Sequence, residues 1–211
     1  MKLYLSSYKL GDNPQALADL VGKNKRIAII PNSRDVYTDA ARRDAGLQNE
    51  KDELSKIGLT PQELDLRKYF GKEEELRKIL SEFGSVWVLG GNTFILRRAY
   101  KESGMDSWLR QHADDEEFVY AGYSAGICVL SPSLKGLETV DSPYLIAEGY
   151  PPDVIWEGVG LIDFAIAPHF MSNHPESEAV NSEVEYLKKN GIEYKTLRDG
   201  EVIIMNVGFK K

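Results

Sequence analysis

The chain has 211 residues, a formal net charge of −7 at pH 7 and a pI near 5.1. This acidity argues against nonspecific partners such as nucleic acid or an anionic membrane, which need basic surface, and the length suits a single domain over residues 1–211. The only cysteine, Cys128, excludes an intramolecular disulfide, which fits a reducing compartment. No apolar run reaches membrane-spanning length, so we expect a cytoplasmic protein.

Short apolar runs alternate with longer amphipathic stretches along the chain, as is typical of a parallel sheet covered by helices on both faces. The predicted strands are 2–6, 26–31, 63–66, 86–90, 118–123, 164–167, 194–197 and 202–206. The predicted helices are 37–57, 72–83, 93–102, 105–114, 125–130 and 176–190. This order predicts a three-layer α/β/α sandwich with a mostly parallel sheet.

Two connections are singled out by their turn residues. Asp199-Gly200 predicts a hairpin between the last two strands, because glycine accepts a positive φ and aspartate tolerates the left-handed region. Residues 131–160 are irregular and rich in proline and glycine. A loop after strand 118–123 either covers a functional site or is a plain surface excursion, and the sequence leaves both open.

The segment Gly122-Tyr-Ser-Ala-Gly126 joins an apolar strand to a predicted helix. A G-x-S-x-G pentapeptide in this context is typical of a nucleophile elbow, in which the glycines permit a tight turn that exposes a strained serine. Ser124 is therefore the candidate nucleophile. The alternative is an ordinary helix-capping serine in a glycine-rich turn.

A serine nucleophile needs a base, most often histidine, oriented by a carboxylate. His169 follows the buried strand 164–167, at the carboxyl end where open α/β sheets place their chemistry, whereas His112 lies in a polar helix end. Asp199 is the first choice for the acid, although it could serve only the turn. Its competitors are Glu138, Asp141 and Asp163.

Acyl transfer also needs N–H donors for the oxyanion. Ala125 supplies one, as the residue after the nucleophile. Gly91 supplies the other, because Gly90-Gly91-Asn92-Thr93 ends a buried strand at a helix start. A phosphate-binding turn is the rival interpretation, but this segment lacks the P-loop lysine and the dinucleotide-binding glycine spacing.

Three ordered motifs together resemble the peptidase E family of aspartyl dipeptidases and cyanophycinase relatives, whose fold is similar to class I glutamine amidotransferases and thus flavodoxin-like. They are Leu89-Gly-Gly-Asn-Thr-Phe94, Gly122-Tyr-Ser-Ala-Gly126 and Ala167-Pro-His-Phe170. The resemblance implies Ser124 as nucleophile, His169 as base and Gly91 as oxyanion donor. An aligned member of the family has Glu-Gly where this chain has Asp199-Gly200, so Glu138 and Asp141 stay as alternative acids.

The resemblance further implies a serine peptidase that acts on short peptides with an N-terminal aspartate and needs no metal and no organic cofactor. The residues expected to bind substrate are Asn92, Thr93, Arg97 and His174, with Arg34 and Arg98 as further cations. We expect a monomer or a homodimer with a small peptide as its only partner. Two other functions stay open, namely a noncatalytic ligand-binding domain of the same fold and an α/β-hydrolase-type esterase that uses Asp141.

Overall fold

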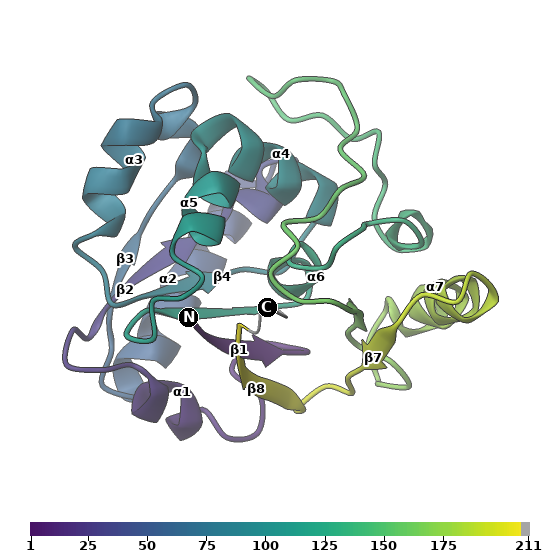
Figure 1. Ribbon diagram of the computed structural model, residues 1–211, viewed down its shortest axis with the longest axis horizontal. Helices are drawn as coiled ribbons and strands as arrows, with labels where there is room; N and C mark the ends of the chain where they lie inside the picture. The colour runs from purple at the N-terminus through teal and green to yellow at the C-terminus, as the bar shows by residue number, and fades with distance from the viewer. Residues whose placement is uncertain (208–211) are drawn as a thin grey trace.

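A computed structural model describes residues 1–207, and a six-stranded sheet lies at its centre (Figure 1). Its strand order is β3-β2-β4-β5-β1-β8. The bounds in that order are Thr60–Glu63, Arg26–Ile30, Ser85–Val88, Val119–Tyr123, Lys2–Ser6 and Val202–Asn206. Neighbouring strands from β3 to β1 are parallel, and β8 pairs with β1 in the antiparallel sense. The predicted α/β architecture with a mostly parallel sheet is confirmed.

Helices cover both faces of this sheet, as Figure 1 shows. One face packs against α3, α4, α5 and α6, which span Glu73–Leu80, Thr93–Ser103, Met105–Gln111 and Ala125–Cys128. The other face packs against α1 and α2, which span Gln15–Leu20 and Ala40–Lys56. Three short 3₁₀ helices, η1, η2 and η3, lie at Asn32–Arg34, Leu66–Tyr69 and Leu137–Thr139.

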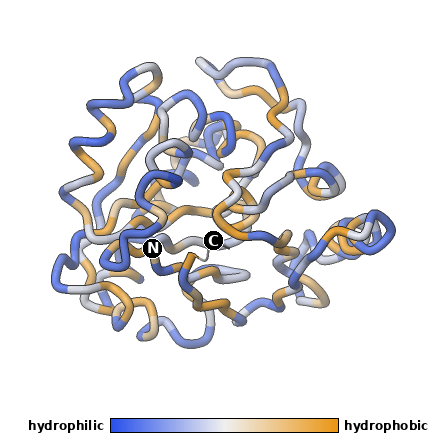
Figure 2. The backbone as a smooth tube through the Cα atoms, in the orientation of Figure 1, coloured by the Kyte–Doolittle hydropathy of each residue, from blue (hydrophilic) through white to orange (hydrophobic). Residues whose placement is uncertain are grey.

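Alternating side chains of the strands build the two halves of the core. In β4, Val86 and Val88 pack in one apolar cluster and Trp87 packs in the other, because successive strand residues point to opposite faces. Hydrophobic residues accordingly concentrate along the central strands, whereas hydrophobic and polar residues alternate along the outer helices (Figure 2). No helix among residues 1–207 is long and apolar enough to cross a bilayer.

A separate two-stranded parallel sheet lies beside the main one. It consists of β6, Ala165–Ala167, and β7, Tyr194–Thr196, connected through α7, Ser177–Lys189. Figure 1 shows α7 and β7 at the periphery, away from the helices that cover the main sheet.

The predicted hairpin across Asp199-Gly200 is wrong. The dipeptide does form a turn, with Gly200 at φ 98° and a hydrogen bond from Glu201 N to Arg198 O. However, β7 pairs with β6, whereas β8 pairs with β1. A turn signal reports a local change of direction, and the partners of the flanking strands depend on contacts distant in sequence.

Two further expectations differ from the structure. The third strand begins at Thr60 rather than at residue 63, because β3 is an edge strand with exposed side chains and the apolar Leu64 and Leu66 follow it. Helix α1 was not expected. Residues 131–160 contain, within the described chain, only η3 and one bridge between Ser133 and Glu157 as regular structure.

Candidate active site

Ser124 lies in the turn between β5 and α6 and is half-buried. Its backbone has φ 49° and ψ −120°, a conformation that a non-glycine residue adopts only under constraint from its surroundings. Packing around the turn also requires its glycines, since a Cβ on Gly126 would lie 2.4 Å from the carbonyl oxygen of Val88. The turn has the strained geometry that the sequence motif predicts.

His169 follows β6 and is held at the same end of the main sheet by Ser7, the residue after β1. Ser6 pairs in register with Tyr123, so Ser7 follows beside Ser124. The backbone N–H of His169 donates to Ser7 Oγ at 2.8 Å. His169 itself is 1% exposed and has φ 61°, a second constrained backbone at this site.

Asp199 is the carboxylate that contacts the imidazole. Its Oδ1 lies 2.6 Å from His169 Nδ1 and accepts a hydrogen bond from Ser7 Oγ at 3.0 Å. The two alternative acids have other partners. Asp141 Oδ2 accepts from Thr93 N at 2.7 Å, and Glu138 Oε2 accepts from Gly136 N at 2.6 Å. The structure thus joins His169 to Asp199, the first choice for the acid in the sequence.

The surroundings of His169 favour its neutral form. Burial lowers the pKa of His169 below 6.5, and the neighbouring His174 acts in the same direction. The hydrogen bond to Asp199 opposes this shift without cancelling it. A neutral imidazole whose Nδ1 faces a carboxylate carries its proton on Nδ1, which leaves the lone pair of Nε2 available to accept another.

The glycine pair after β4 lies directly beside Ser124. A Cβ on Gly90 would come within 3.0 Å of the Ser124 Cβ, and one on Gly91, which has φ 153°, would lie 2.6 Å from Ser33 O. Within residues 1–207, neither Gly91 N nor Ala125 N donates a hydrogen bond to the protein. Both N–H groups are therefore without a protein acceptor in the described chain.

Three of the residues expected to bind substrate, Asn92, Thr93 and Arg97, lie at or in α4 and have partners within the protein. Asn92 caps α4 through its Oδ1, which accepts from Ile95 N, and donates from Nδ2 to Ser142 O. Thr93 is buried, with its N–H on Asp141. Arg97 is 4% exposed and pairs with Asp106 at 3.0 Å. The side chains of Asn92 and Arg97 serve the scaffold, so the geometry does not support the substrate contacts expected of these two, whereas Thr93 is held through its backbone N–H.

The other two arginines also have fixed partners. Arg98 is fully buried and donates to the carbonyl oxygens of Pro143, Leu145 and Asp153, which ties the irregular 131–160 segment to α4. Arg34 donates from Nε to Gly90 O at 2.9 Å. Of the cations expected from sequence, only His174 lies against the candidate base.

A buried polar network that the sequence did not indicate holds Tyr123, the residue before Ser124, in place. Glu50 of α2 is 3% exposed and accepts from Tyr123 Oη at 2.7 Å and from Trp87 Nε1 at 2.9 Å. Arg34 contacts the Tyr123 hydroxyl and lies 3.8 Å from Glu50. Because Arg34 also holds Gly90 O, one network connects the residue before Ser124 with the glycine pair.

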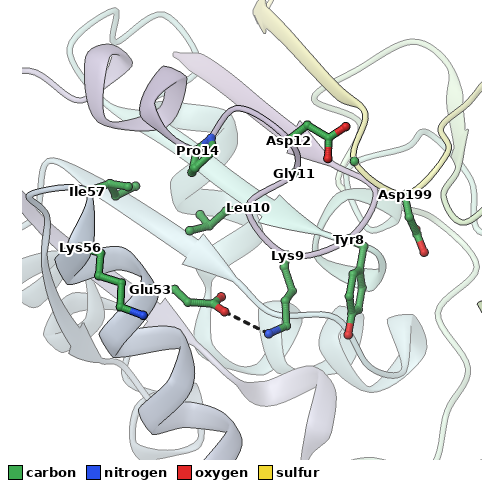
Figure 3. Close-up of a pocket in the computed structure, with 11 residues that line it drawn as sticks. Tyr8, Lys9, Leu10, Gly11, Asp12, Pro14, Glu53, Lys56, Ile57 and Asp199 are labelled. Carbon is green, nitrogen blue, oxygen red and sulfur yellow. Dashed lines mark hydrogen bonds and ion pairs between the residues drawn. The ribbon is translucent and has the colours of Figure 1, made fainter.

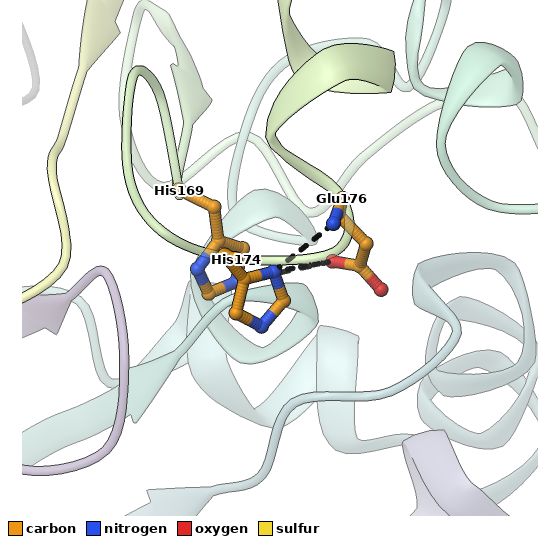
Figure 4. A group of neighbouring side chains, drawn as sticks. All are labelled: His169, His174 and Glu176. Atoms are coloured by element: carbon orange, nitrogen blue, oxygen red, sulfur yellow. Dashed lines mark hydrogen bonds and ion pairs between the residues drawn. The ribbon is translucent and has the colours of Figure 1, made fainter.

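His174 and Glu176 complete the surroundings of His169 (Figure 4). The two imidazole rings stack with centroids 3.7 Å apart and planes 8° from parallel. Glu176 Oε2 lies 3.9 Å from His169 Nε2 and 3.9 Å from His174 Nδ1. Glu176 was also missed from sequence, where it reads only as the start of a helix.

These three side chains offer ligand atoms within 4.8 Å of one another, a grouping that metal-ligand spacing in the sequence did not indicate. However, a metal lies in the plane of each imidazole that binds it, whereas these rings are stacked face to face. His174 Nδ1 moreover accepts a hydrogen bond from Glu176 N at 3.3 Å. Both rings would have to turn before an ion could be held.

A pocket of about 560 Å³ adjoins the site and shares two residues with it (Figure 3). Tyr8 and Asp199 both line this pocket, and the Tyr8 ring lies 5.9 Å from the ring of His169. Across the pocket, Lys9 and Glu53 form an ion pair at 3.2 Å. Asp199 therefore has its imidazole partner in the site and an open pocket next to it.

The strained serine after β5, the carboxylate-bound histidine after β6 and the mostly parallel α/β architecture define a serine hydrolase of the α/β class. Comparison with known proteins narrows this class. The model of peptidase family S51 matches residues 5–208, and the chain belongs to that family.

Similar proteins agree with this assignment. The chain is 35% identical to a peptidase E of Streptomyces coelicolor over 57% of its length and 48% of the relative's. It is 30% identical to a candidate alpha-aspartyl dipeptidase of Drosophila melanogaster, over 57% of this chain and 49% of that one. The crystal structure of a candidate peptidase E from Listeria monocytogenes superposes with a TM-score of 0.73 at 24% identity, covering 98% of both chains. The protein is a serine peptidase with a peptidase E fold.

Proposed function

We propose that this peptidase hydrolyses short peptides, dipeptides with an N-terminal aspartate first among them, through a Ser124-His169-Asp199 triad and an acyl-enzyme. The observation that carries the proposal is the 2.6 Å contact between His169 Nδ1 and Asp199 Oδ1 beside a strained serine. It fixes the imidazole in the tautomer that a general base needs.

The reaction begins with attack of Ser124 Oγ on the peptide carbonyl while His169 Nε2 accepts the serine proton. The free N–H groups of Gly91 and Ala125 stabilise the oxyanion that forms. His169 then protonates the departing amine, which leaves an ester on Ser124. Water, activated by the same imidazole, hydrolyses this ester and regenerates the serine.

A hydrogen bond between Ser124 Oγ and His169 Nε2 is not formed in the structure, within the described residues. Catalytic hydrogen bonds are often long before substrate binds and shorten in the Michaelis complex. Support for peptides as substrates comes from the family, and support for an N-terminal aspartate comes from the name of the Drosophila relative.

A fluorophosphonate probe tests the nucleophile. It should label the wild type and leave Ser124→Ala unlabelled, and equal labelling of both proteins would refute the assignment. A panel of Asp-X dipeptides, followed by β-linked aspartyl peptides, then tests the substrate. A protein that binds peptides equally well with and without Ser124, and hydrolyses none, would instead be a noncatalytic binding domain.

A further inference from the structure

The carboxylate of Glu176, the residue directly before α7, points away from that helix and toward His169. Glu176 occupies the N-cap of α7, yet its side chain makes no capping hydrogen bond to that helix. It lies instead 3.9 Å from His169 Nε2, the nitrogen that faces the reacting atoms in the proposed mechanism. Its side chain is 42% exposed, so a small ligand in the site can reach it.

Within residues 1–207, no lysine or arginine forms an ion pair with Glu176, and the two histidines are the basic side chains beside it. His169 is held neutral by burial, so it does not neutralise the carboxylate. Burial and the nearby charge of Asp199 raise the pKa of Glu176 from its usual value. A carboxylate in this position gains from a cationic partner.

Charges of both signs act on Tyr37, Glu176 among them. Burial raises the pKa of Tyr37, the charges of Asp141 and Glu176 raise it further, and the charges of Arg34 and Arg42 lower it. None of the three arginines expected from sequence pairs with Glu176, because Arg34 donates to Gly90 O, Arg97 pairs with Asp106 and Arg98 donates to Pro143 O. Glu176 therefore has no arginine or lysine partner among residues 1–207 and can bind a positively charged group of a substrate.

We propose that Glu176 binds the α-ammonium group of the substrate and so restricts the enzyme to cleavage after the first residue of a peptide. The inference rests on the proposed function. In a free amino-terminal residue the ammonium nitrogen lies about 2.5 Å from the carbonyl carbon, because only Cα separates them. A carboxylate within 3.9 Å of the base can thus reach that nitrogen while Ser124 attacks the carbonyl. A residue inside a longer chain presents a neutral amide there, with no charge for Glu176 to bind.

The test compares Asp-Ala with N-acetyl-Asp-Ala as substrates. The wild type should prefer the free amine by about 10- to 100-fold in kcat/KM, the range expected for one charge-assisted contact. Glu176→Gln should lose most of that preference, and Glu176→Asp should retain part of it. The ratio of the two substrates cancels any effect of the substitution on His169 itself, because both substrates use the same base.

Glu178→Gln is the matched control, since Glu178 is exposed on the same helix, and it should keep the wild-type ratio. Equal rates for the two substrates in the wild type, or an unchanged ratio in Glu176→Gln, would overturn the inference. Calorimetric binding of the same two peptides to Ser124→Ala separates this inference from the proposed function. A preference for the free amine there upholds the ammonium site even if the wild type hydrolyses neither peptide.

Discussion

Ser7 joins His169 to Asp199 from behind: its Oγ accepts the backbone N–H of His169 at 2.8 Å and donates to Asp199 Oδ1 at 3.0 Å. The same carboxylate oxygen lies 2.6 Å from His169 Nδ1. Because Ser7 directly follows β1, the central sheet fixes the distance between a histidine and an aspartate that are 30 positions apart in the chain.

Replacement of Asp199 should affect catalysis much more than binding. We expect Asp199→Asn to lower kcat by about 10³- to 10⁴-fold, because the amide no longer fixes the tautomer of His169 or stabilises its protonated form. Steady-state hydrolysis of a cleaved dipeptide measures the effect. Glu138→Gln should retain wild-type activity, and a larger loss in that variant would transfer the acid role to the 131–160 segment.

The pH dependence of acylation should follow the lowered pKa of His169. Burial favours the neutral imidazole, so the base form persists to a pH below 6.5, and kcat/KM should be level at neutral pH and fall only on the acid side of that value. Burial also raises the pKa of Asp141 to about 6, so the profile is repeated with Asp141→Asn, which should keep the acid limb. A midpoint above pH 7 would contradict the neutral, buried histidine.

The network around Glu50 should contribute both to stability and to the placement of the serine. Glu50→Gln puts an amide donor where two oxygens accept from Tyr123 and Trp87, so we expect a loss of about 2 kcal/mol in the free energy of unfolding. A displaced Tyr123 should also lower kcat by about tenfold. Urea unfolding and steady-state kinetics measure the two effects.

Glu53→Gln is the control for Glu50, because Glu53 lies on the same helix, α2, and forms a partly exposed ion pair with Lys9. Its loss should lower the free energy of unfolding by no more than about 1 kcal/mol. Equal losses of unfolding free energy in both variants would show that the buried network stabilises the protein no more than the exposed ion pair does.

Arg98 should hold the irregular segment against the fold. Arg98→Met keeps much of the side-chain length but leaves the carbonyl oxygens of Pro143, Leu145 and Asp153 without their donor. We expect faster amide hydrogen exchange over residues 141–157 and a stability loss of about 2 to 4 kcal/mol. Lys101→Met, on an exposed position of α4, should change neither quantity. If Arg98→Met showed faster amide exchange only in segments outside residues 141–157, this role of Arg98 would be refuted.

Local patterns in the sequence determined most of the helices and strands and marked Ser124 as the candidate nucleophile. Strands 2–6 and 202–206 match β1 and β8, because alternation and apolar content act within a few residues. The Gly122–Gly126 motif predicted a strained serine between a strand and a helix, since the glycines that permit such a turn are adjacent in the chain.

Only the tertiary structure decided which distant groups meet. In the sequence, Asp199 was the first choice over Glu138, Asp141 and Asp163. Only the tertiary structure shows that Asp199, which follows β7 where β7 pairs with β6, contacts His169. Glu176 and Glu50 carry no local motif, so their positions next to His169 and Tyr123 follow from packing alone. Contacts of this kind depend on chain closure over long separations, which no short sequence pattern encodes.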